Sequence, residues 1–88
     1  MRSKPAIVGK WLLAGNSVSG DVYAIDRLRG KLGWHVTASN GIRSGIVVAK
    51  QGSAYTAYFA DGATYVYAVD VRNGKILWST KAGVVIWL

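Results

Sequence analysis

Short apolar segments separated by glycine-rich turns run along the whole chain of 88 residues. Residues 31–36 read KLGWHV, in which every second residue is apolar. Leu32, Trp34 and Val36 are therefore expected on one face of a β-strand. Residues 76–80, ILWST, continue the same alternation. The pattern predicts strands cut by tight turns and gives little sign of helix.

A segment of eleven residues is nearly repeated 44 positions later, as AIDRLRGKLGW at residues 24–34 and AVDVRNGKILW at residues 68–78. Each copy predicts a hairpin of two strands joined by a turn. The expected strands cover residues 22–25 and 31–36 in the first copy, and residues 65–69 and 75–80 in the second. Repetition at this interval is typical of repeat architectures.

Each predicted hairpin turn is opened by an aspartate and closed by a glycine. The carboxylates of Asp26 and Asp70 can accept hydrogen bonds from backbone N–H groups two or three residues later. Gly30 and Gly74 can take a positive φ without a Cβ clash. Because the two aspartates hold equivalent places in two hairpins, they do not converge on one site. We expect them to cap turns rather than to act as catalytic carboxylates.

Two further strands are expected before each hairpin, at residues 6–8 and 11–14 in the first unit and at residues 44–49 and 54–59 in the second. Four antiparallel strands in about 40–45 residues is the size of one propeller blade. We therefore predict an all-β fold of two four-stranded antiparallel propeller blades, which is a partial β-propeller.

The expected blades cover residues 1–38 and 39–81, and residues 82–88 are expected to start a third blade or to add an edge strand. No apolar run approaches the ~18 residues that a membrane span needs. The N-terminus resembles a secretion signal only briefly, because Pro5 and Lys10 interrupt its apolar segment. The compartment therefore cannot be assigned from these residues.

Composition narrows the candidate chemistry. The chain has no glutamate. It also has no cysteine, and this excludes a disulfide framework and thiolate metal sites. The lone histidine, His35, is expected to be a polar strand residue rather than a metal ligand. Eleven Lys and Arg against four Asp give a net charge of +7, which attracts anions in general. Five cations in or beside the two hairpin turns form a candidate basic rim: Arg27, Arg29, Lys31, Arg72 and Lys75.

The spacing Ala-x-Asp-x-x-x-Gly-x-x-x-Trp resembles the tryptophan-docking motif of the pyrroloquinoline-quinone-like (PQQ-like) β-propeller repeat family. The motif residues are Ala24, Asp26, Gly30 and Trp34 in the first copy, and Ala68, Asp70, Gly74 and Trp78 in the second. Where the family usually has Thr before the glycine, this chain has Arg29 and Asn73. The resemblance implies that Trp34 and Trp78 each pack between their own blade and the neighbouring one. It also suggests the periplasm or cell envelope.

The resemblance implies two kinds of function. In one branch, as in an outer-membrane assembly lipoprotein, the ring is a non-catalytic scaffold for protein partners. In the other branch, PQQ-dependent alcohol and sugar dehydrogenases hold a quinone and calcium with Glu, Asn and Asp. Because this chain lacks Glu, we favour the scaffold, with no catalytic residue, cofactor or metal site. A fragment or relic of a dehydrogenase is the alternative, and binding of anions or nucleic acid by the basic rim is a lesser one.

Two blades do not close a propeller, since rings use about four to eight. A lone pair of blades would expose apolar sheet faces and unpaired strand edges. The expected partners are therefore other blades, either in a longer form of the same chain or in a homo-oligomer, with a further protein partner also open. We favour the fragment, because no sequence feature specifies closure, and do not expect the isolated chain to be a stable monomer.

Overall fold

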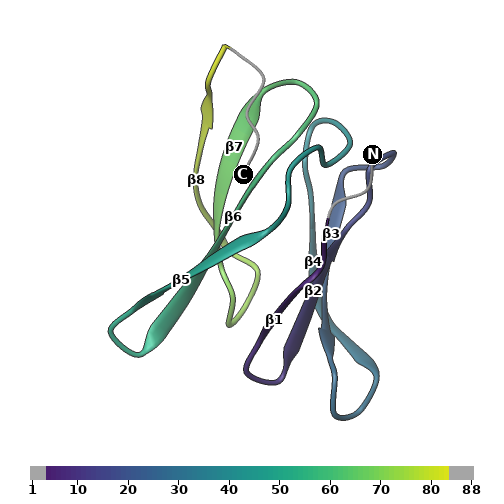
Figure 1. Ribbon diagram of the computed structural model, residues 1–88, viewed down its shortest axis with the longest axis vertical. Helices are drawn as coiled ribbons and strands as arrows, with labels where there is room; N and C mark the ends of the chain where they lie inside the picture. Colours follow the sequence, from purple (N-terminus) through teal and green to yellow (C-terminus); the bar gives the residue numbers. More distant parts are fainter. Residues whose placement is uncertain (1–3, 84–88) are drawn as a thin grey trace.

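A computed structural model describes residues 4–83, which form two four-stranded antiparallel sheets (Figure 1). The first sheet contains β1 (Ala6–Val8), β2 (Trp11–Gly15), β3 (Asp21–Asp26) and β4 (Lys31–Thr37). The second sheet contains β5 (Val47–Gln51), β6 (Ala54–Ala60), β7 (Tyr65–Asp70) and β8 (Ile76–Lys81). In both sheets the strands are ordered as they follow in the chain. This confirms the prediction of an all-β fold with two blades.

The start of β5 differs from the sequence prediction, which placed it at residue 44. The strand begins at Val47, and Ser44 belongs to the connection between the sheets. The Ser44 hydroxyl accepts a hydrogen bond of 2.8 Å from the Ala60 N–H and donates one of 2.8 Å to the Gly45 carbonyl. Such side-chain bonds to the backbone replace strand pairing. The other predicted strands agree with the structure to within one residue at each end.

A β-bulge in each hairpin changes which side chains share a face. In the first sheet Ala24 pairs with Trp34, but the next residue, Ile25, pairs with Leu32, so Gly33 is an extra residue in β4. Paired residues lie on one face and successive residues on opposite faces. The prediction that Leu32 and Trp34 share a face is therefore wrong, because the bulge shifts the alternation. The second sheet has the same irregularity at the equivalent position.

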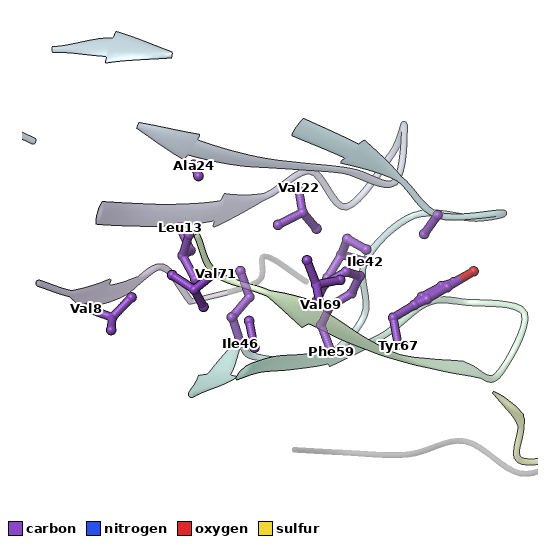
Figure 2. Packing of buried hydrophobic residues seen from close by; sticks show 12 residues of the cluster. Val8, Leu13, Val22, Ala24, Ile42, Ile46, Phe59, Tyr67, Val69 and Val71 are labelled. Atoms are coloured by element: carbon purple, nitrogen blue, oxygen red, sulfur yellow. The ribbon is translucent and has the colours of Figure 1, made fainter. Parts of the chain in front are cut away.

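The hydrophobic core lies between the two sheets (Figure 2). Leu13 and Val22 of the first sheet and Phe59 and Val69 of the second are buried there, together with Ile42 from the connection. Fully burying one such side chain stabilises a fold by about 1.5–3 kcal/mol. The connection between the sheets therefore contributes to the core as well as linking the two blades.

The first sheet ends at Thr37 and the second begins at Val47, so the predicted blade boundary after residue 38 falls at the start of the connection. Most of the predicted C-terminal strand, residues 84–88, lies outside the described residues. Between residues 4 and 83 no helix is long and apolar enough to cross a membrane.

Candidate docking surfaces

Trp34 joins the two sheets. Its indole N–H donates a hydrogen bond of 2.9 Å to the carbonyl oxygen of Val71, which lies in the turn between β7 and β8. The ring also covers Gly74 in that turn, where an added Cβ would lie 2.6 Å from the ring atom Cε3. Gly74 has a φ of +78°, so glycine is needed there both for the backbone conformation and for the indole. Trp34 thus lies in the interface between the blades.

The two hairpin turns have the same construction. The Asp26 carboxylate accepts hydrogen bonds of 3.0 and 3.3 Å from the backbone N–H groups of Leu28 and Arg29. The Asp70 carboxylate accepts one of 2.9 Å from the Arg72 N–H. Both glycines, at positions 30 and 74, donate their N–H to the carbonyl of the aspartate that opens the turn. The aspartates are therefore occupied in holding their turns, of which the second meets Trp34 of the first sheet.

Trp78 is equivalent to Trp34 in sequence but faces away from the first sheet. Val69 points into the core, so the preceding Ala68, and Trp78 paired with it, lie on the opposite side of the second sheet. Trp78 is 48% exposed, and its ring centroid lies 6.1 Å from that of Tyr58. We call this side of the sheet the second outer face; its main residues are Val47, Tyr58, Ala68 and Trp78.

The first sheet also exposes an apolar side, because Leu13 is buried in the core and Leu12 beside it points away. Ile7 and Leu32 on this side are 68% and 57% exposed. We call it the first outer face; its residues are Ile7, Leu12, Ala14, Tyr23, Ile25 and Leu32. The ring of His35 stacks on Tyr23 with centroids 5.8 Å apart, so this histidine packs on an aromatic neighbour.

The five cations of the candidate basic rim lie in or beside the two hairpin turns, which are at the same end of both sheets (Figure 1). Two of them are engaged locally. The Arg72 guanidinium forms an ion pair of 2.9 Å with Asp70 and holds the pKa of that carboxyl below its ordinary value. Arg27 donates a hydrogen bond of 2.8 Å from Nε to the Gly9 carbonyl. Arg29, Lys31 and Lys75 are exposed. The rim therefore presents scattered cations, two of which support the turns.

A buried polar network that the sequence analysis missed joins the connection to the second sheet. Asp61 is only 3% exposed, and its carboxylate accepts hydrogen bonds of 2.8 Å from the hydroxyls of Tyr67 and Ser39. It also accepts hydrogen bonds of 3.0 Å from the backbone N–H groups of Ala63 and Tyr65. Burial raises the pKa of Asp61, but these hydrogen bonds outweigh burial, and the pKa lies below its ordinary value. The Asp-Gly pair at residues 61–62 signals only the turn.

Comparison with known proteins identifies one family. A protein-family model described as outer membrane protein assembly factor BamB matches residues 5–86. The match is of the PQQ-like repeat type and includes both hairpins, both sheets and the connection between them. Among curated protein sequences no match was found.

Proposed function

Because this chain belongs to the BamB-type family of PQQ-like β-propeller repeats, we propose that it is a non-catalytic scaffold that binds other proteins through its two outer faces. The observation that carries the proposal is the apolar character of both faces. The first outer face exposes Ile7 and Leu32, and the second exposes Val47 and Trp78. Contiguous exposed apolar surface is typical of protein interaction sites.

The surroundings of the carboxylates also support a scaffold. Asp26, Asp61 and Asp70 accept hydrogen bonds within their own turns. The carboxylate of Asp21 accepts hydrogen bonds from the hydroxyls of Thr37 and Ser19, at 2.6 and 2.8 Å. Carboxylates used in this way hold the backbone, whereas a quinone and calcium site needs carboxylates directed at the ligand. The alternative of a dehydrogenase fragment or relic predicts a change in quinone absorbance when PQQ and calcium are added.

Binding of anions by the basic rim remains a lesser alternative. Arg29, Lys31 and Lys75 are exposed at one end of the sheets and would attract a polyanion. Such binding would weaken steeply with salt, because phosphate contacts release counterions. Binding of labelled single-stranded DNA that falls as salt is raised would support this alternative, whereas docking through the apolar faces depends little on salt.

Site-specific photo-crosslinking tests the scaffold in cells that naturally produce the chain. Leu32 on the first outer face and Val47 on the second would each be replaced by p-benzoylphenylalanine. Val18 is the control, because it is 87% exposed in the loop between β2 and β3. We expect protein adducts at both face positions and none at position 18. Adducts at position 18 alone, or none at any position, would contradict the proposal.

A further inference from the structure

Each outer face is equivalent in the repeat to a face that already packs in the core. The first outer face corresponds to the core-facing side of the second sheet, and the second outer face to the core-facing side of the first sheet. The row Ile7, Leu12, Ile25 and Leu32 crosses the first outer face. In the equivalent row of the second sheet, Val48, Ala57 and Val69 belong to the core between the sheets, and Ile76 ends the row 45% exposed. Trp78 likewise repeats Trp34, which lies in the interface. On the basis of the proposed function, we infer that a second copy of this chain docks head to tail, with the second outer face of one copy against the first outer face of the next.

The β3–β4 turn offers the contacts that a docking indole uses in the interface. Around Gly30, which has a φ of +69°, an added Cβ would have no atom within 4 Å, whereas the equivalent space at Gly74 is filled by Trp34. Arg27 holds the place of Val71, directly after the aspartate of its turn. In the part of the chain that is described, the Arg27 carbonyl accepts no hydrogen bond, whereas that of Val71 accepts the Trp34 indole N–H. The indole N–H of Trp78 from a second copy would donate a hydrogen bond to this carbonyl.

The sizes of the side chains on the two outer faces also match. The packed interface contains Leu13 from the first sheet and Phe59 from the second. On the outer faces these positions hold Tyr58 and Ala14, so the larger side chain lies on the opposite partner and faces a small one. The equivalence follows from strand pairing: Leu13 and Tyr58 pair with Ala24 and Ala68, and Ala14 and Phe59 pair with Tyr23 and Tyr67. A large side chain opposite a small one lets two facing layers interdigitate.

Because the two faces differ, the contact is heterologous: each copy presents one half to the copy before it and the other half to the copy after it. Such contacts generate a ring where the rotation closes and an open chain where it does not. Closed rings of two to four copies would contain about four to eight blades, the usual size of a propeller.

Sedimentation equilibrium over a concentration series tests the docking with three variants of the full chain. Gly30→Asn places a side chain in the open space that the docking indole would occupy, and Asn tolerates a positive φ. Trp78→Ala removes the docking indole. Gly52→Asn is the matched control, because Gly52 has a φ of +62° and equally open surroundings but lies in the β5–β6 turn. We expect the unmodified chain and Gly52→Asn to associate alike, and the other two variants to associate about tenfold or more weakly.

Mixing the two weakened variants separates head-to-tail docking from a symmetric contact. Gly30→Asn retains Trp78, and Trp78→Ala retains the open turn, so their equimolar mixture should form a one-to-one dimer that grows no further. A chain carrying both substitutions should stay monomeric alone and in either mixture. A monomeric unmodified chain, an equal effect of Gly52→Asn, or no rescue on mixing would overturn the inference. If crosslinks from Leu32 and Val47 reach only other proteins, the scaffold stands and docking of a second copy is wrong.

Discussion

Trp34 and Trp78 show that the surroundings of a residue are set by what lies opposite its sheet. Both follow the same turn, and both pair with an alanine of the preceding strand. Trp34 meets the turn of the second sheet and donates to the Val71 carbonyl, whereas Trp78 is 48% exposed. The identity of the side chain is the same, but only one of the two indoles contributes to the interface between the sheets.

The two tryptophans should therefore respond differently to truncation. Trp34→Ala removes ring packing and a hydrogen bond, so the free energy of unfolding should fall by on the order of 2–4 kcal/mol, somewhat less than for a fully buried indole. Trp78→Ala should cost less than about 1 kcal/mol at concentrations where the chain does not associate. Chemical denaturation followed by circular dichroism measures both values. Equal losses would mean that Trp34 does not dock as described.

Asp61 makes the stability depend on acidity. Its carboxyl has a lower pKa in the folded chain than in the unfolded chain, where the value is about 3.9. The ionised form therefore favours folding above that value, and this contribution is lost as the pH falls through the folded-state pKa. Asp61→Asn should lower the free energy of unfolding by about 1–3 kcal/mol at neutral pH. It should also reduce the further decrease of this free energy as the pH is lowered below about 4. Denaturation between about pH 2 and 7 tests this.

Asp21 supplies the comparison for Asp61. Hydrogen bonds from Thr37 and Ser19 lower the pKa of Asp21 as well, but this side chain is more exposed. Asp21→Asn should therefore also reduce the loss of unfolding free energy at acid pH, but by less than Asp61→Asn does. If Asp61→Asn keeps the acid profile of the unmodified chain, the buried network contributes nothing to the pH dependence.

At the scale of the element, the hairpin turns were predicted from the sequence because their chemistry is local. An aspartate followed four residues later by glycine specifies the cap and the positive φ, and both turns form in this way. The bulge could not be predicted from alternation, because Leu32, Trp34 and Val36 read as an unbroken strand pattern. Gly33 was the one available signal, since glycine within a strand often marks a bulge. Its counterpart, Leu77, gives no such signal.

Gly33 also shows why the first bulge requires a small residue. An added Cβ at this position would lie 2.3 Å from the ring atom Cζ3 of Trp11, so the indole of Trp11 covers the bulge. In the second sheet Thr56 stands where Trp11 stands, since the two residues pair with Asp70 and Asp26. The counterpart of Gly33 in that sheet is Leu77, which is 49% exposed. The two sheets thus build the same bulge with reciprocal side-chain sizes.

Alanine substitutions at the two turn glycines test the docking of Trp34, because the backbone strain is similar at both positions and cancels in the comparison. Gly30 and Gly74 have φ values of +69° and +78°, so alanine imposes a similar strain of roughly 1 kcal/mol at either position. Only at position 74 does the new Cβ also meet the Trp34 ring. Gly74→Ala should therefore be more destabilising than Gly30→Ala by on the order of 1–3 kcal/mol in thermal or chemical denaturation. Equal losses would contradict a close indole at Gly74.

At the scale of the whole molecule, two sheets of four strands were predictable from the 44-residue repeat, but the docking state of each tryptophan was not. That state depends on which sheet lies opposite, and the repeat gives both tryptophans the same local sequence. The connection was also beyond prediction, because Ile42 reaches the core without belonging to any of the eight strands. Ser39 and Asp61 are far apart in the sequence, so their hydrogen bond depends on how the connection folds over the second sheet.

The shared core predicts that the two blades unfold together. Phe59 is 1% exposed and lies among residues of both sheets, so Phe59→Leu should cost about 1 kcal/mol. Because neither sheet has a core of its own, amide hydrogen exchange should become faster by a similar factor in β3 and in β7. Val18→Ala, in a loop where the side chain is 87% exposed, should change neither strand. If Phe59→Leu accelerates exchange only in β7, the sheets are separate folding units, and a stack of such blades would gain its cohesion only from the docking of tryptophans.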